Sequence, residues 1–247
     1  MKKSSPIEDT RFPFPNKTGR LWQAIFLDFD GVVVESADIK TEAYRELFVG
    51  ESATLVRRIL RYHARNMGVS RQVKFSHIFK SILRRPLTPP DRAKLGKRFS
   101  QLVKEEVIDC PLVRGASRFL ERWRRGVDVY VVSGTPQSEL RNIISRRGLG
   151  KFFRGIYGSP RTKAEIVRKV LRVKKYDPRR VVFVGDAMTD LQAAAQTSIP
   201  FVGRAPRSRC FHPHRPPVVR DLNALNTWLT SARGAGPWIP GGTHGRR

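Results

Sequence analysis

Apolar runs of strand length alternate with amphipathic stretches of helical length over most of this chain. The predicted strands are residues 21–29, 127–132, 155–157, 181–184 and 200–202. The helices predicted between and beside them are residues 37–48, 137–147, 163–173 and 188–196. Because strands that alternate with helices pair in parallel through right-handed crossovers, the pattern predicts an α/β fold.

A different pattern occupies residues 51–110, where no strand is indicated. Three helices are expected there, near residues 52–66, 70–83 and 90–106, with Thr88 or Asp91 available to cap the third. One predicted strand precedes this segment and the others follow it, so we interpret it as an all-helical insertion. The predicted organisation is a flexible arm (1–20), a core (21–36 and 111–231), a helical cap (37–110) and a disordered tail (232–247).

The chain is strongly basic, with 48 lysine and arginine residues against 21 acidic residues and a net charge of +27. Such a surface attracts polyanions, and nucleic acid is the usual one. The basic residues are scattered, and no zinc-finger spacing, RNA-recognition signature or basic zipper accompanies them. We therefore interpret the charge as a property of the surface that permits nonspecific polyanion binding at low salt, and expect no specific nucleic-acid partner.

Composition also bears on the compartment. Two cysteines, Cys110 and Cys210, make no disulfide framework, and residues 1–20 lack the apolar segment of a signal peptide. No run of apolar residues approaches the length of a membrane-spanning helix. We expect a soluble cytoplasmic protein with no membrane partner, either a monomer or a homodimer.

Polar residues stand directly after three predicted strands and at the start of one predicted helix. They are Asp28 and Asp30, Ser133 and Gly134, Asp186 and Asp190, and, opening the helix, Lys163. Functional residues of open parallel sheets collect at the carboxyl ends of the strands, so these side chains are expected to converge. Buried carboxylates persist where a cation neutralises them, which predicts a site for a hard divalent ion, Mg²⁺, beside a phosphate.

The residue types suggest a role for each member of this group. Asp28 is assigned as the nucleophile, since an aspartyl phosphate divides a hard displacement into two steps. Asp30 is assigned as general acid and base, provided that the turn at Gly31 brings it back over the site. We assign Ser133, Gly134 and Lys163 to binding of the phosphoryl oxygens. We assign Asp28, Asp30 and Asp186 as the metal ligands. Asp190 is expected to hold Lys163 or a metal-bound water in place.

These four pieces, in this order, resemble the four motifs of the haloacid dehalogenase-like hydrolases. The resemblance covers about residues 21–36 and 111–203 and is fullest in Asp-Phe-Asp-Gly-Val from Asp28 to Val32. It implies a doubly wound, Rossmann-like core with a helical cap inserted after the first motif. The magnesium-dependent phosphatases of the family carry nucleophile and acid/base at the positions of Asp28 and Asp30. The branch that the chain is most similar to contains phosphoglycolate phosphatase and β-phosphoglucomutase.

Other branches of the family fit less well. Its dehalogenases lack the acid at the position of Asp30. Its phosphonatases use a cap lysine as a Schiff base, and we assign no such lysine in residues 39–51. Two departures from the pattern are Glu35, where many relatives have Asp, and Ala187, where Ser is common.

The cap contributes candidates for recognition of the leaving group. They are His63, Arg65, Arg71, Lys74 and His77, with Glu35 from the first motif as a further specificity candidate. For the cap residues a solvated basic face is the favoured alternative. A metal site formed by Cys210, His212 and His214 is disfavoured, since no second acid or cysteine lies nearby.

The functional hypothesis is therefore a Mg²⁺-dependent phosphatase that hydrolyses a small phosphorylated metabolite through an aspartyl phosphate. The metabolite is expected to be phosphoglycolate-like or sugar-phosphate-like. A phosphomutase is the first alternative, because it uses the same four pieces and differs in how the cap closes. The second alternative is a basic nucleic-acid-binding or scaffold protein without catalysis.

Overall fold

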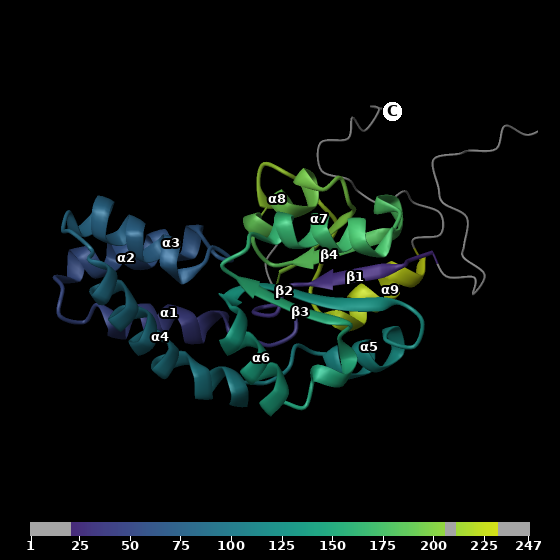
Figure 1. Cartoon of the computed structure of the whole chain (residues 1–247), viewed down its shortest axis with the longest axis horizontal. Helices are drawn as coiled ribbons and strands as arrows, with labels where there is room; N and C mark the ends of the chain where they lie inside the picture. The colour runs from purple at the N-terminus through teal and green to yellow at the C-terminus, as the bar shows by residue number, and fades with distance from the viewer. Residues whose placement is uncertain (1–20, 206–210, 232–247) are drawn as a thin grey trace, which may run out of the picture.

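A six-stranded parallel sheet forms the centre of the protein in the computed structural model, which describes residues 21–205 and 211–231 (Figure 1). The predicted arm (1–20) and tail (232–247) lie outside the described residues. In spatial order the strands are β3 (Gly155–Ser159), β2 (Asp128–Pro136), β1 (Ala24–Leu27), β4 (Val181–Gly185), β5 (Phe201–Arg204) and β6 (Val218–Val219). The order reverses beside β1, as in a doubly wound sheet, so the predicted fold class is confirmed.

The central strand β1 shows why the sheet is covered on both faces. All of its side chains are buried, and successive side chains point to opposite faces. Ile25 and Leu27 pack into one apolar cluster, and Ala24 and Phe26 pack into the other. A parallel sheet that is buried on both sides requires continuous apolar runs rather than alternation, which is the pattern that the sequence has.

Helices form the two outer layers of this core. One layer covers the face of Ile25 and contains α5 (Ala116–Trp123), α6 (Gln137–Arg146) and α9 (Leu222–Ser231). The other covers the face of Phe26 and contains α7 (Lys163–Lys174) and α8 (Met188–Gln196). Figure 1 shows the sheet between these layers, with α7 and α8 on one side and α5, α6 and α9 on the other.

The chain between β1 and β2 is helical and lies mainly beside the carboxyl ends of β1 and β2 (Figure 1). Its elements are α1 (Ala37–Leu47), α2 (Ala53–Arg65), α3 (Arg71–His77), a π-helix (Ile78–Leu83), α4 (Pro89–Asp109) and α5 of the core layer. Thr88 rather than Asp91 is the N-cap of α4, where its hydroxyl accepts the backbone N–H of Asp91. We call α1–α4 with the π-helix the cap.

Three elements differ from the sequence-based expectation. The strand β2 extends beyond the predicted residues 127–132 through Ser133-Gly134-Thr135-Pro136, because Pro136 still pairs with Ser159 after an irregularity in the ladder. The predicted helix at residues 70–83 is α-helical only to His77 and then π-helical. The helices α5 and α9 and the short strand β6 were not predicted. In the described part of the chain, no helix is both long and apolar enough to span a membrane.

Candidate active site

The carboxyl end of β1 places Asp28 at the centre of the site. Its side chain is buried, and one carboxylate oxygen accepts the backbone N–H of Phe29 at 2.7 Å. The other oxygen lies 2.7 Å from the amine of Lys163, which also donates to Asp190 at 2.5 Å. Lys163 begins α7, where Thr162 and Glu165 form a capping box that fixes the first turn. The predicted convergence of Asp28, Lys163 and Asp190 is therefore present in the structure.

Asp186, after β4, completes an acidic group with Asp28 and Asp190. One oxygen from each of the three carboxylates lies within 4.8 Å of the others. Gly31 has a left-handed backbone (φ +73°), and any side chain there would collide with the carboxylate of Asp186. The turn after β1 can therefore approach β4 closely enough to bring these acids together.

The single lysine in this cluster, Lys163, does not balance its three carboxylates. Burial raises the pKa of Asp186 well above its usual value, and the charges of Asp28 and Asp190 raise it further. Burial also raises the pKa of Asp28, against the opposing effect of Lys163, and raises that of Asp190 to about 7. Three oxygen ligands and this unbalanced charge fit a hard divalent cation such as Mg²⁺.

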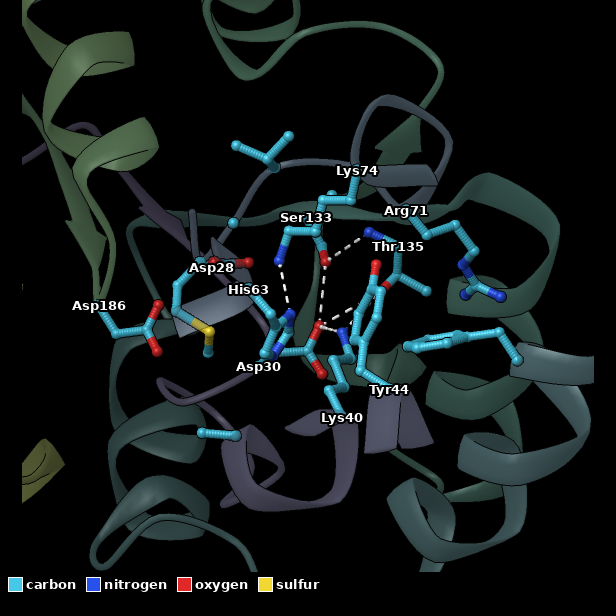
Figure 2. A pocket seen from close by; sticks show the side chains of 16 residues that line it. Asp28, Asp30, Lys40, Tyr44, His63, Arg71, Lys74, Ser133, Thr135 and Asp186 are labelled. Carbon is cyan, nitrogen blue, oxygen red and sulfur yellow. Dashed lines mark hydrogen bonds and ion pairs between the residues drawn. The ribbon is translucent and has the colours of Figure 1, made fainter. Parts of the chain in front are cut away.

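Asp30 lies outside that acidic group and has partners of its own. Its carboxylate accepts from Ser36 at 2.7 Å. It also accepts from Lys40 at 2.5 Å and from Thr135 at 3.1 Å (Figure 2). Burial alone would raise the pKa of Asp30, but Lys40 and these hydroxyls outweigh burial and hold it below its usual value. The structure thus places Asp30 near Asp28, the predicted nucleophile, but does not group its side chain with the other proposed metal ligands.

Two of the predicted phosphate-binding residues, Ser133 and Gly134, lie on β2, the neighbour of β1. Ser133 is buried, and its hydroxyl accepts the backbone N–H of Thr135 at 3.1 Å. A Cβ at Gly134 would lie 2.6 Å from the carbonyl oxygen of Gly68, in the loop between α2 and α3. Only glycine permits this approach, so the cap loop rests directly on the predicted phosphate-binding loop.

The cap contributes buried polar side chains to the same pocket. Tyr44 on α1, His63 on α2 and Lys74 on α3 line it together with Asp28 and Asp30 (Figure 2). The amine of Lys74 lies 2.9 Å from Nδ1 of His63. Two of the predicted recognition residues, His63 and Lys74, are therefore buried in the pocket rather than on a solvated basic face.

Arg71 also lines the pocket but is bound within the protein. Its guanidinium pairs with Glu139 on α6 and donates to the hydroxyl of Ser100 on α4 at 2.7 Å. Ser100 in turn donates to Glu139 at 2.5 Å. This arrangement connects the cap to the core layer, and it places Arg71 neither on a solvated basic face nor free of protein partners.

Three further candidates do not reach the pocket. Glu35 pairs with Arg204 at 2.5 Å and so fixes the first motif to the end of β5, which corrects its assignment to specificity. Arg65 and His77 are exposed, and the ring of His77 stacks on Tyr62. His212 and His214 are also exposed, whereas Cys210 lies outside the described residues.

Sequence analysis missed Lys40, Tyr44 and Thr135. Lys40 lies in the stretch 39–51, where we considered only a Schiff-base lysine and assigned none, and it pairs with Asp30 and donates to Thr135 at 3.1 Å. The available signal was its position on the first turn of the helix that directly follows the first motif. Tyr44 has the apolar spacing of a core residue, and nothing in the sequence distinguishes it from one.

The comparisons with known proteins agree with this geometry. The family model for haloacid dehalogenase-like hydrolases matches residues 22–197. A phosphoglycolate phosphatase from Pseudomonas putida is 29% identical over 104 residues, which cover 40% of this chain and 38% of that protein. The alignment therefore spans well under half of the curated relative.

Solved structures show a similar fold. The β-phosphoglucomutase of Clostridium difficile has 15% identity and a TM-score of 0.68, over 85% of this chain and 98% of that one. The magnesium-bound HAD-hydrolase YfnB of Bacillus subtilis has 17% identity and a TM-score of 0.64, over 85% and 99% of the two chains. At these identities the likeness shows the fold alone.

Proposed function

Because the chain belongs to the haloacid dehalogenase-like hydrolases, we propose that it is a Mg²⁺-dependent phosphatase that hydrolyses a small phosphorylated metabolite, phosphoglycolate-like or sugar-phosphate-like, through an aspartyl phosphate. One observation carries the proposal. The buried carboxylate of Asp28 is held by Lys163, with Asp186 within ligand distance and the hydroxyl of Ser133 and the backbone of Gly134 lining the same pocket. The proposed nucleophile, the ammonium of Lys163 and the proposed phosphate-binding groups thus lie together at one place.

The chemistry follows from these positions. A carboxylate oxygen of Asp28 attacks phosphorus, the bond to the ester oxygen breaks, and the departing alcohol takes a proton from Asp30. A water that gives a proton back to Asp30 then attacks the aspartyl phosphate, which releases inorganic phosphate and restores Asp28. Lys163 offsets the charge of the phosphoryl oxygens throughout. When bound, Mg²⁺ would be held by Asp28 and Asp186 and would supply further positive charge to these oxygens.

The partners of Asp30 suit the second of these steps. Lys40, Ser36 and Thr135 favour the ionised form, which is the form that removes a proton from water. The closed cap and the contact between Gly68 and Gly134 favour a small substrate over a nucleic-acid duplex. A cytoplasmic location and a monomer or homodimer stay predictions from the sequence.

The test is phosphate release from a panel of metabolite esters and p-nitrophenyl phosphate, with Mg²⁺ and with excess chelator. We expect Mg²⁺-dependent release from the full chain and none from Asp28→Asn. A phosphomutase would instead convert a sugar phosphate to its isomer with little release. Wild-type turnover by Asp28→Asn would refute the covalent mechanism.

A further inference from the structure

The two sides of the pocket differ in how their charged groups are paired. The buried lysine and arginine side chains in the described ranges are Arg71, Lys74, Lys163 and Arg204. Three of them pair with carboxylates. Arg71 pairs with Glu139, and Arg204 pairs with Glu35. Lys163 pairs with both Asp28 and Asp190. Lys74 is 3% exposed and, among the described residues, has no carboxylate partner. Burying a cation without an anion is costly, so this arrangement requires an explanation.

The neighbours of Lys74 are also incompletely bonded. In the described part of the chain, Nε2 of His63 and the hydroxyl of Tyr44 are buried side-chain atoms without a hydrogen-bond partner. Their rings lie 4.4 Å apart, and the amine of Lys74 lies 5.5 Å from the centre of the Tyr44 ring. Buried polar groups are rarely left unpaired, and here two such groups and an unpaired cation line the same pocket.

All three groups can donate hydrogen bonds to a ligand. Burial, Lys74 and Lys40 lower the pKa of His63 to about 3, so the imidazole is neutral. An ammonium can only donate, so Nδ1 of His63 accepts from Lys74 and the ring proton is assigned to Nε2. Lys74, His63 and Tyr44 therefore offer N–H and O–H groups and one positive charge. Their complement is a group with several acceptor oxygens and a negative charge.

We propose that Lys74, His63 and Tyr44 form an anion subsite for an acidic group on the leaving-group part of the substrate. This inference rests on the proposed phosphatase function and narrows it to phosphate esters of small hydroxy acids, as opposed to neutral sugars. One lysine matches the single charge of a carboxylate better than the double charge of a second phosphate. The subsite lies on three cap helices, whereas the proposed phosphoryl site lies on the core, so one molecule would bridge the two parts.

The test compares three esters on the full chain: phosphoglycolate, 2-hydroxyethyl phosphate, in which a hydroxymethyl group replaces the carboxylate, and ethylene glycol bisphosphate. We expect kcat/KM for phosphoglycolate to exceed that for 2-hydroxyethyl phosphate at least about tenfold, mainly through KM. Lys74→Met should remove most of this ratio, and Tyr44→Phe, which removes only a hydroxyl, should reduce it. Lys80→Met, an exposed lysine on the π-helix, is the matched control and should preserve it.

The thermal stability of Lys74→Met distinguishes an anion subsite from a structural role for Lys74. If the role is structural, the substitution should lower Tm. Removing a buried, unpaired charge should leave Tm unchanged or raise it in Lys74→Met, while recognition of the acid is lost. A lower Tm with an unchanged ratio between the esters would overturn the inference. Preference for the bisphosphate would overturn the assignment to a carboxylate.

Calorimetric titration separates this inference from the proposed function. Hydrolysis of no ester, p-nitrophenyl phosphate included, would refute the phosphatase. Phosphoglycolate binding in the presence of Mg²⁺ is measured on the full chain if no ester is hydrolysed, and on Asp28→Asn, which is expected not to turn the ester over, if one is. In both cases the subsite predicts affinity at least about tenfold above that for 2-hydroxyethyl phosphate. Equal affinity, or no binding of either ester, would overturn the subsite.

Discussion

The core side and the cap side of the pocket solve the problem of buried charge in different ways. On the core side, Lys163 lies between Asp28 and Asp190, and Asp30 is paired with Lys40 from the first cap helix. On the cap side, Lys74 lies beside the neutral ring of His63 and faces the ring of Tyr44, and within the described ranges it has no carboxylate partner. A paired network holds its geometry before any substrate arrives, whereas an unpaired donor gains most when a ligand supplies the missing anion. The difference supports the proposal that the core performs the chemistry and that the cap selects the molecule.

The largest effect is expected from breaking the core side at Asp28. Asp28→Asn should lower turnover by at least about 10³-fold, because a neutral amide is not a nucleophile towards phosphorus. In this variant Lys163 keeps its ion pair with Asp190, so the protein should still fold. Phosphate release measures the loss, and a circular dichroism spectrum that matches the wild type confirms the fold.

Removal of the metal should also act on the core side. We expect excess chelator to abolish turnover and Mg²⁺ or Mn²⁺ to restore it better than Zn²⁺, because the ligands are carboxylates. Mg²⁺ at about 100 times its Kd should add about 2.7 kcal/mol to the free energy of unfolding. Thermal unfolding of Asp186→Asn is the control: a wild-type Mg²⁺ response in this variant would place the ion elsewhere.

Breaking the ion pair on Asp30 should have an intermediate effect. Lys40→Met removes the main group that lowers the pKa of Asp30, so this pKa should rise and the acid limb of the kcat–pH profile should move to higher pH. General-base catalysis contributes on the order of 10²–10⁴-fold in rate, and we expect part of that to be lost near neutral pH. A pH profile with Lys40→Arg as the conservative control measures it. If the acid limb of the Lys40→Met profile does not move, Asp30 is not the general base.

The cap side should give a smaller, pH-dependent effect. Burial and the charge of Lys40 lower the pKa of Lys74 to about 7, while Asp186 opposes this shift, and His63 opposite it is neutral. Lys74 carries its charge below that pKa and loses it above, so affinity for an acidic ester should fall as pH rises, by at most about tenfold per pH unit. Measuring KM for phosphoglycolate across neutral pH, from slightly acidic to slightly basic buffer, tests this. If the affinity of Lys74→Met for phosphoglycolate still falls as pH rises, the titration of Lys74 is not the cause.

Salt should produce the smallest change in turnover. The net charge of +27 predicts retention of DNA or RNA at low salt that disappears at moderate salt, as counterion release requires. The buried site is screened far less, so turnover of a small ester should change by less than about threefold. Both are measured on one salt series, with Lys163→Ala as the inactive control. Sequence-selective binding that survives high salt would contradict this prediction.

The sequence by itself determined the core and the positions of the proposed catalytic residues on it. Continuous apolar runs at β1 and β4 require burial on both faces, and parallel strands bring their carboxyl ends to one edge. Asp28, Lys163 and Asp186 converge for that reason, although they are far apart in the chain. Each stands at the end of a strand or the start of a helix, where local pattern fixes position.

Only the tertiary structure decided which basic residues of the cap enter the site. Helical periodicity indicates the buried face of a helix but not the groups that a buried polar residue meets across a packing interface. Arg71 and Lys74 lie one helical turn apart and had equal standing in the sequence. Glu139, 68 residues from Arg71, neutralises Arg71 and leaves Lys74 without an anion. That choice depends on contacts between separate helices, so no local pattern in the chain contains it.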